Sequence, residues 1–176
     1  YQEILTDPSY AGQIITFTFP HIGNVGANDA DIETITPPAR GLVLRAAITD
    51  PSNYRATRHL DDWLKSHDLP GISGIDTRKL TRRIRDEGAP NGALCHAPDG
   101  NLDIMELHRL AAEWPGLEGM DLAKEVSCRQ TYKWEETRWA FAEGGRPEGY
   151  GALTDAKKKV VAIDYGAKRN ILRCLA

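Results

Sequence analysis

The first candidate for chemistry is the neighbouring pair Cys95-His96, because a thiol activated by an imidazole is a nucleophile. Such a nucleophile needs its base within hydrogen-bond distance. The pair falls in a short predicted strand, residues 93–97, where neighbouring side chains point to opposite faces. The two groups therefore cannot face each other, and the sequence favours a structural role for both.

A second set of polar residues contains the ligand types of a metal site: His59, His67, Asp61, Asp62 and Asp68. The two histidines are about two helical turns apart, so one ion cannot reach both without help. The pattern favours a solvated helix face, and we expect no metal site.

The loop Gly23-Asn24-Val25-Gly26 has the glycines of an anion-binding loop. It lacks the length and the lysine of a phosphate-binding motif, and it is not shown to open a helix. Glycines in such a loop mainly serve the backbone geometry. A structural turn is the favoured interpretation.

One predicted helix, residues 76–87, is strongly basic. It carries Arg78, Lys79, Arg82, Arg83 and Arg85, and the helical period places Arg78, Arg82 and Arg85 on one side. Nucleic acid would be attracted to such a helix, but no aromatic residues are interleaved and the rest of the chain is acidic. Three alternatives stay open: a solvated face, an acidic protein partner, and carboxylates of the same chain, since Arg pairs bidentately with carboxylates.

The segment from Val160 to Leu175 predicts a strand, a turn and a helix, the unit from which open α/β sheets are built. Residues 164–168 would lie at the carboxyl end of the strand, where such sheets bind ligands. The glycine pattern of a dinucleotide site is missing. Lys168 is a candidate for the edge of a site, and a solvated lysine is the alternative.

Other elements must position these residues. The patterns predict strands over residues 13–19 and 41–48 and two strands within 125–141, and helices over 54–66, 76–87 and 102–113. Ser52 or Asn53 can cap the first helix, Asp76 the second, and Gly88 ends the second. The residues expected to face the core are Leu60, Trp63, Leu64, Leu80, Ile84, Ile104, Leu107, Leu110 and Ala111.

The composition is that of a globular protein: 41% of the residues are hydrophobic, 27% are charged, and the net charge is −3. No apolar run approaches the roughly 20 residues of a membrane helix, so no membrane association is predicted. Three widely spaced cysteines fit neither a disulfide framework nor a zinc knuckle. Reduced thiols in the cytoplasm are therefore expected. Because no partner strand follows residues 160–163 and the chain lacks an initiator Met, we expect a piece of a longer protein.

Six stretches, in order along the chain, resemble one family. They are YQEILTDPSY (1–10), PHIGNVG (20–26), IDTRKLTR (75–82), GAPNG (88–92), PGLEGMDLAKEV (115–126) and DYGAKRNIL (164–172). The chain resembles the small, glutamine-hydrolysing subunit of carbamoyl-phosphate synthetase. Each motif alone is weak, but the ordered set is specific.

The resemblance implies an α/β fold. Residues 1–143 would form a swivelling three-layer β/β/α domain without its N-terminal strands, and residues 144–158 a linker. Residues 159–176 would begin an open α/β domain of the class I glutamine amidotransferase type.

The resemblance also implies the activity. The family hydrolyses glutamine with a Cys-His-Glu triad, and none of these catalytic residues falls in this segment, which is therefore expected to be inactive alone. Ammonia passes to a large synthetase subunit, the main partner, which makes carbamoyl phosphate from bicarbonate with ATP and Mg²⁺. By the same resemblance, the small subunit itself needs no cofactor. The whole enzyme would be a ligase, and its product would feed arginine and pyrimidine biosynthesis. No nucleic acid is expected as a partner.

Four residues carry a role by resemblance. Lys168 matches a family lysine near the glutamine site and the domain junction, and Asp76, Thr77 and Arg78 belong to the domain that contacts the large subunit. Replacing Arg78 with Ala is predicted to weaken that contact. A different class of function, a non-catalytic interaction module that retains only the first domain, is the alternative.

Overall fold

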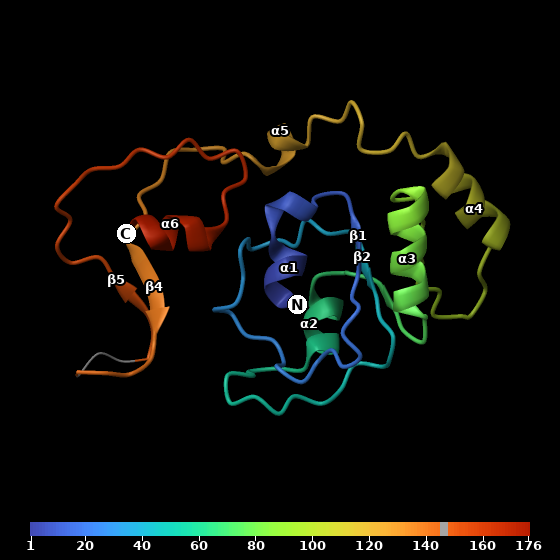
Figure 1. Cartoon of the computed structure of the whole chain (residues 1–176), viewed down its shortest axis with the longest axis horizontal. Helices are drawn as coiled ribbons and strands as arrows, with labels where there is room; N and C mark the ends of the chain where they lie inside the picture. The colour runs from blue at the N-terminus through green and yellow to red at the C-terminus, as the bar shows by residue number, and fades with distance from the viewer. Residues whose placement is uncertain (145–147) are drawn as a thin grey trace. The chain divides into compact units, whose positions relative to one another are not determined.

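The computed structural model describes residues 1–144 and 148–176 (Figure 1). The chain divides into two compact units, Tyr1–Met120 and Asp121–Ala176. Unit 1 is α/β, as predicted, and it holds the parallel sheet. Unit 2 is smaller and combines an antiparallel strand pair with helices.

The sheet of unit 1 has three short parallel strands in the order β1-β2-β3: β1 is Ile14–Thr16, β2 is Gly41–Val43 and β3 is Gly71–Ile72. Leu42 of β2 lies between Ile15 of β1 and Gly71 of β3. The strands predicted over residues 13–19 and 41–48 are confirmed in place but are shorter. The β1–β2 ladder pairs three residues of each strand and the β2–β3 ladder pairs two.

Unit 1 also contains α1 (Gln2–Thr6), a 3₁₀ turn (Pro8–Tyr10), α2 (Leu60–Ser66), α3 (Thr77–Glu87) and α4 (Ile104–Glu113). Its core joins the first helix, the sheet and α2. The fully buried members include Leu5, Leu42, Leu60 and Trp63, the last with 1% of its surface exposed. Burying one such side chain stabilises a fold by about 1.5–3 kcal/mol, so α2 fixes the sheet from one face.

The predicted start of the first long helix is wrong, because α2 begins at Leu60 and not near Tyr54. The Asn53 side chain, expected to cap this helix, instead caps a turn by accepting the Arg55 N–H at 2.9 Å. Thr57 and Arg58 then bond the backbone of Ala27. Pairing with a distant segment therefore outcompetes the helix over these residues. The predicted inward face of Leu60, Trp63 and Leu64 is confirmed.

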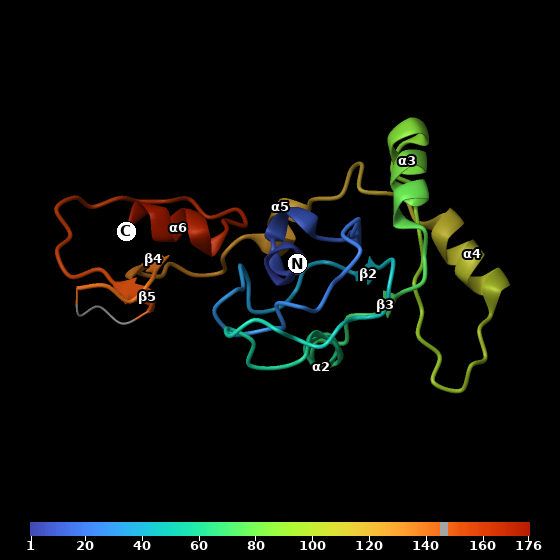
Figure 2. The ribbon, with the colours of Figure 1, turned by 60° about the horizontal axis from the view of Figure 1, so that its bottom comes forward.

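The predicted inward face of α4 is wrong, because α4 contains no buried residue. Ile104 is 63% exposed and Leu110 is 47% exposed. Two polar contacts of α4 are local: the Asp103 side chain accepts the Glu106 N–H at 2.9 Å, and Arg109 forms an ion pair with Glu106. Figures 1 and 2 show α3 and α4 at the same end of unit 1. The predicted strand over residues 93–97 is also wrong, because those residues pair with no strand among the described parts of the chain.

Unit 2 comprises α5 (Leu122–Val126), the antiparallel pair β4 (Glu136–Ala140) and β5 (Gly149–Ala152), and α6 (Arg169–Leu175). Of the two strands predicted within 125–141, the second is confirmed. The first is wrong: α5 ends at Val126 and no strand precedes β4 there. Asp121 caps α5 by accepting the Lys124 N–H at 3.2 Å.

The strand predicted over residues 160–163 is wrong for this structure. Val161 is 81% exposed, Ile163 is 78% exposed, and no ladder forms there among the described residues. A strand is stabilised by hydrogen bonds to a neighbouring strand, and none of the described residues forms such a ladder with residues 160–163. The helix that follows is confirmed as α6, but Ile171 and Leu175 on its predicted apolar side are exposed, and only Leu172 of that side is buried.

The predicted linker, residues 144–158, contains β5, and its residues 145–147 lie outside the described residues. Along the chain, the boundary between the two compact units falls after Met120, so the division into 1–143, 144–158 and 159–176 stays a prediction. Within the described residues, no helix combines the length and the apolar character needed to cross a membrane.

Candidate functional site

The α3 helix is built by local signals that the sequence displays. Asp76 caps it, its Oδ1 accepting the Lys79 N–H at 3.0 Å, and Gly88 ends it with a φ of 89°. A cap of this kind stabilises a helix by about 1 kcal/mol. The predicted boundaries, Asp76 as cap and Gly88 as terminator, are confirmed.

The start of α3 is also held by the two residues that directly follow β2. The backbone N–H of Gly74 donates to Arg45 O and that of Ile75 donates to Leu44 O, both at 3.2 Å. Thr77, the first helical residue, has none of its surface exposed. The helix therefore leaves the sheet from a held position, and its outer side chains are presented on a rigid base.

The three residues predicted as a partner interface have three different environments. Asp76 is committed to the cap, Thr77 is fully buried, and Arg78 is exposed. Asp76 and Arg78 are both exposed, but the Asp76 carboxylate already serves the cap, whereas Arg78 forms no ion pair among the described residues. The Thr77 hydroxyl has no hydrogen-bond partner among the described residues, and its burial is a tertiary feature that the local sequence does not reveal.

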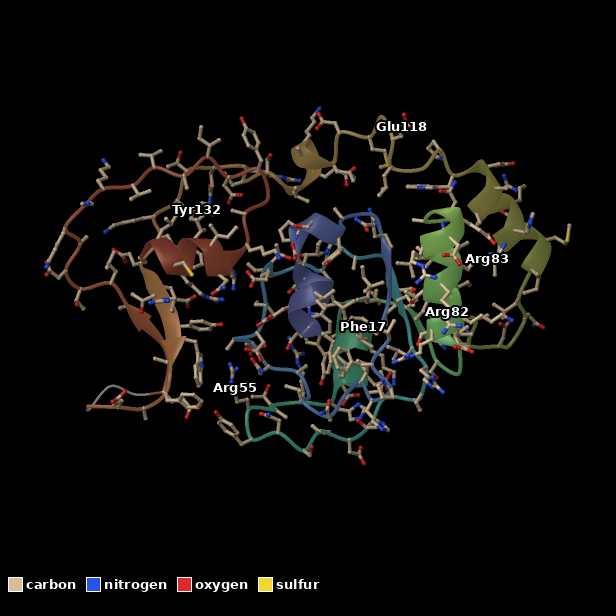
Figure 3. All side chains as sticks on the ribbon, viewed as in Figure 1. Phe17, Arg55, Arg82, Arg83, Glu118 and Tyr132 are labelled. Atoms are coloured by element: carbon tan, nitrogen blue, oxygen red, sulfur yellow. The ribbon has the colours of Figure 1, made fainter. Side chains whose placement is uncertain are left out.

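The other basic residues of α3 divide into two groups. Arg83 pairs with Glu87 at 2.9 Å and Arg85 pairs with Asp86 at 3.0 Å. Arg82 is exposed, and Figure 3 shows it with Arg83 projecting from α3. The alternative of pairing within the chain is therefore confirmed for Arg83 and Arg85. Exposed ion pairs of this kind contribute little to stability, and the i,i+4 pair Arg83–Glu87 is expected to contribute about 0.3–0.5 kcal/mol.

Lys168 lies at the cap position of α6, with extended backbone, and not in the first helical turn as predicted. The preceding turn is organised by Asp164, whose Oδ1 accepts the N–H groups of Gly166 at 2.8 Å and Ala167 at 2.7 Å. Its Oδ2 accepts the hydroxyl of Tyr132 at 2.6 Å. No local pattern in the sequence indicates this contact, because 32 residues separate the two side chains.

Both groups of the Tyr132–Asp164 contact have shifted pKa values. Burial raises the pKa of Tyr132 to about 12, and the hydrogen bond to Asp164 adds to the shift. Burial alone would raise the pKa of Asp164, but the N–H groups of Ala167 and Gly166 and the Tyr132 hydroxyl outweigh it. The Asp164 pKa therefore lies below its ordinary value, and the turn holds a carboxylate at neutral pH.

The histidines considered as metal ligands serve the fold instead. The Nδ1 of His59 accepts the Asp61 N–H at 3.1 Å and so caps α2, while His67 ends α2 with its ring centroid 4.6 Å from that of Trp63. Burial and the charge of Arg58 lower the pKa of His67. Over residues 1–144 and 148–176, no three acidic, His or Cys residues gather as a metal site.

The glycine loop is a close-packed turn, as predicted. The Gly26 N–H donates to Gly23 O at 2.7 Å. A Cβ on Gly23 would lie 2.4 Å from Thr49 O, and one on Gly26 would lie 2.4 Å from the Cβ of Ala56. The loop needs glycine because neighbouring backbone and side chains leave no room for a Cβ.

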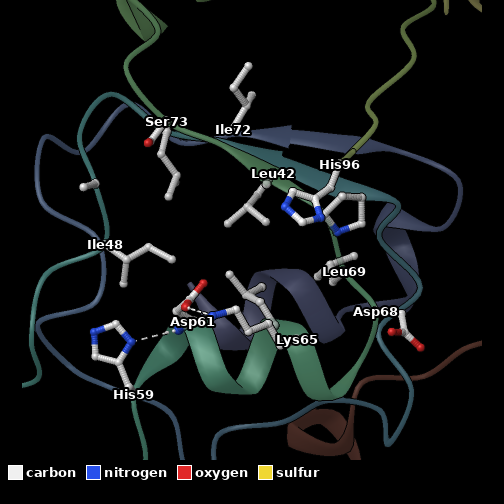
Figure 4. Close-up of a pocket in the computed structure, with 15 residues that line it drawn as sticks. Leu42, Ile48, His59, Asp61, Lys65, Asp68, Leu69, Ile72, Ser73 and His96 are labelled. Atoms are coloured by element: carbon white, nitrogen blue, oxygen red, sulfur yellow. Dashed lines mark hydrogen bonds and ion pairs between the residues drawn. The ribbon is translucent and has the colours of Figure 1, made fainter. Parts of the chain in front are cut away.

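A pocket of about 560 Å³ lies between α2 and the sheet in unit 1 (Figure 4). Leu42 and Leu69 are among its apolar walls, and His59 and His96 lie at opposite ends. Lys65 on the rim pairs with Asp61. Cys95 is not among the lining residues, so the pocket does not bring a thiol together with an imidazole.

Comparison with known proteins gives the family. Residues 1–94 match the family described as carbamoyl-phosphate synthase small chain, CPSase domain. This stretch includes the sheet and α3. The chain belongs to the carbamoyl-phosphate synthase small-chain family. The resemblance seen in the ordered motifs is thereby confirmed.

Individual relatives of the small-chain family are similar along the chain. The carbamoyl phosphate synthase small chain of Bradyrhizobium diazoefficiens is 59% identical over 180 positions, and that of Ruegeria pomeroyi is 57% identical over 176. Each alignment covers 100% of this chain and 44% of the relative. The small chain of Caulobacter vibrioides is 51% identical, with 45% of it covered. The chain thus spans less than half the length of these relatives.

Proposed function

We propose that this chain is part of the glutamine-hydrolysing subunit of a carbamoyl-phosphate synthetase and that this part contacts the large synthetase subunit. The observation that carries the proposal is α3: it lies in the stretch shared with the family, its start is held by the residues that follow β2, and it presents Arg78 outward. Ammonia released from glutamine would pass to the large subunit, which uses ATP and Mg²⁺. The small subunit itself would hold no cofactor.

The proposal includes the finer architecture. Unit 1 would belong to a swivelling β/β/α domain reaching residue 143, and residues 159–176 would begin a class I amidotransferase domain. Lys168 would lie near the glutamine site or the domain junction. The Asp164 turn before it is a rigid base for such a role, since three hydrogen bonds fix the carboxylate. The glutaminase nucleophile would lie outside this chain, and the enzyme would act in the cytoplasm.

The test is to express this chain together with the large synthetase subunit and to purify through a tag on the large subunit. We expect the chain to co-purify, and we expect no glutamine hydrolysis by the chain alone. Loss of co-purification in the unaltered chain would contradict the proposed contact. Glutamine hydrolysis by the purified chain would contradict the placing of the nucleophile elsewhere.

A further inference from the structure

The outer side of α3 is basic in an otherwise acidic chain. Five of its eleven residues are Arg or Lys and two are acidic, so α3 carries a net charge of +3 while the whole chain carries −3. Three of the five basic residues of α3 are exposed and form no salt bridge among the described residues. They are Arg78, Lys79 and Arg82, here named the basic face. For the described parts of the chain, no carboxylate lies within 4.0 Å of these three cations.

The basic face opposes the electrostatics of its own helix. Arg78 and Lys79 stand in the first turn, where the helix dipole favours anions, and that turn contains no acidic residue. Arg78 and Arg82 are four residues apart, so two like charges neighbour each other. The acid at this end of α3 is its cap, Asp76, and no acid follows it in the first turn, where one would add stability. These charges are therefore best explained by an interaction outside the helix.

The geometry of α3 suits rigid docking. Thr77 is buried, while Leu80 and Ile84 are half-buried on the side of the helix away from the basic face. The backbone bonds of Gly74 and Ile75 hold its start. Because the backbone of α3 is already fixed, binding would order only the long cationic side chains. Less conformational entropy is then lost on binding.

We propose that the basic face docks onto a carboxylate-bearing protein surface, which in the proposed function belongs to the large synthetase subunit. Guanidinium groups bind carboxylates bidentately, and complementary charge raises the rate of association and fixes its register. This inference rests on the proposed function and adds the chemistry of the contact. The partner surface would present aspartates or glutamates spaced to meet Arg78 and Arg82, one helical turn apart.

A protein partner suits this face better than nucleic acid does. Single-stranded nucleic acid is held by basic grooves with interleaved aromatic residues, and α3 contains no aromatic residue. The charges outside α3 sum to −6, which repels a polyanion. Nucleic-acid binding is kept as an outcome of the test.

The experiment measures binding of the purified chain to the immobilised large subunit at about 50 mM and about 300 mM NaCl, where screening differs strongly. The test variant is Arg78→Glu/Arg82→Glu. The matched control is Lys157→Glu/Lys158→Glu, which changes the net charge equally at two exposed lysines. Arg78→Gln is measured too, together with the Tm of every protein and its binding to single-stranded RNA.

We expect the high-salt buffer to weaken wild-type binding about tenfold and the α3 variant to bind at least about tenfold more weakly at low salt. Arg78→Gln should weaken binding less, and the control should bind like the wild type. The Tm of Arg78→Gln should match the wild type, so that a loss of binding does not reflect unfolding.

Equal affinity of the α3 variants and the wild type would overturn the docking face and leave the proposed function standing. A wild-type chain that fails to bind the large subunit at either salt would overturn both. RNA binding that the α3 variant abolishes, with subunit binding unchanged, would assign the face to nucleic acid instead.

Discussion

Arg173 of α6 donates from Nε to the Oε1 of Glu136 on β4 at 2.7 Å, and this ion pair joins the helix to the strand pair in unit 2. The two partners are buried to very different degrees, since the Arg173 side chain is 3% exposed and the Glu136 side chain is 41% exposed. The guanidinium also stacks 3.6 Å from the ring centre of Tyr150 on β5. A buried cation is therefore neutralised by a carboxylate that water also reaches.

This asymmetry predicts that the two partners are not equivalent on mutation. Glu136→Gln leaves a buried guanidinium without an opposite charge and should destabilise unit 2 by about 2 kcal/mol. Arg173→Met leaves Glu136 solvated and fills most of the space, so it should cost about 1 kcal/mol. Hydrogen exchange of the amides in residues 169–175 measures both effects. A larger cost for Arg173→Met would contradict the account.

The caps of α3 and α4 have the same chemistry but different connections to the fold. Asp76 and Asp103 each accept an N–H three residues on, but α3 begins at the buried Thr77 while α4 has no buried residue. Asp76→Ala should therefore lower the global free energy of unfolding by about 1 kcal/mol. Asp103→Ala should fray α4 and leave the global value unchanged.

Urea unfolding followed by circular dichroism separates these outcomes, and Asp76→Asn is the control because Asn also caps helices well. Equal shifts of the urea midpoint for both alanine variants would show that α4 is coupled to the core after all.

The elements that the sequence predicted correctly are those specified by neighbouring residues. Asp76 and Gly88 bound α3 within its own segment, so tertiary contacts were not needed to place it. The apolar run 160–163 failed as a strand, because pairing depends on another segment. The apolar periodicity likewise predicted one inward side for α4. Burial of that side requires another element to pack on it, and α4 has no buried residue.

The candidate site follows the same division. The basic side of α3 was visible in the spacing of Arg78, Arg82 and Arg85. The burial of Thr77 and the contact of Tyr132 with Asp164 were not visible in the sequence. Each depends on residues that are distant in the chain. Side chains that depend on the tertiary fold leave no periodic signal in the sequence.

The Tyr132–Asp164 hydrogen bond predicts stability changes at both ends of the pH range. Folding lowers the Asp164 pKa. The contribution of Asp164 to the free energy of unfolding is therefore present above its unfolded pKa of about 3.9, and it is lost as the pH falls through the folded value. The Tyr132 pKa is raised, so its contribution is present below pH 10 and is lost as the pH rises toward about 12.

The ultraviolet absorbance of tyrosinate, titrated in the wild type and in Tyr132→Phe, isolates this phenol by difference. The difference curve should be centred well above 10, near 12. In Asp164→Asn the centre should move toward 10, because a negative partner is lost. A difference curve centred at the ordinary tyrosine value would show that the contact does not form in solution.

Two glycines with positive φ should respond very differently to a methyl group. Gly23 has a φ of 116°, and a Cβ there would lie 2.4 Å from Thr49 O and 2.6 Å from the Cγ2 of Ile48. Gly100 has a φ of 74°, but a Cβ there meets nothing within 4 Å. Gly100→Ala should therefore cost only the backbone strain, about 1 kcal/mol, and Gly23→Ala about 3 kcal/mol or more.

Thermal or urea unfolding of the two alanine variants beside the wild type measures the difference. The clash at Gly23 is with the backbone of Thr49, which its own hydrogen bond from N to Ile22 O holds in place. The loop therefore cannot relieve the contact by a side-chain rotation. Equal, small losses for Gly23→Ala and Gly100→Ala would mean that residues 22–26 can shift without disturbing the core, and the close-packed account of this loop would be wrong.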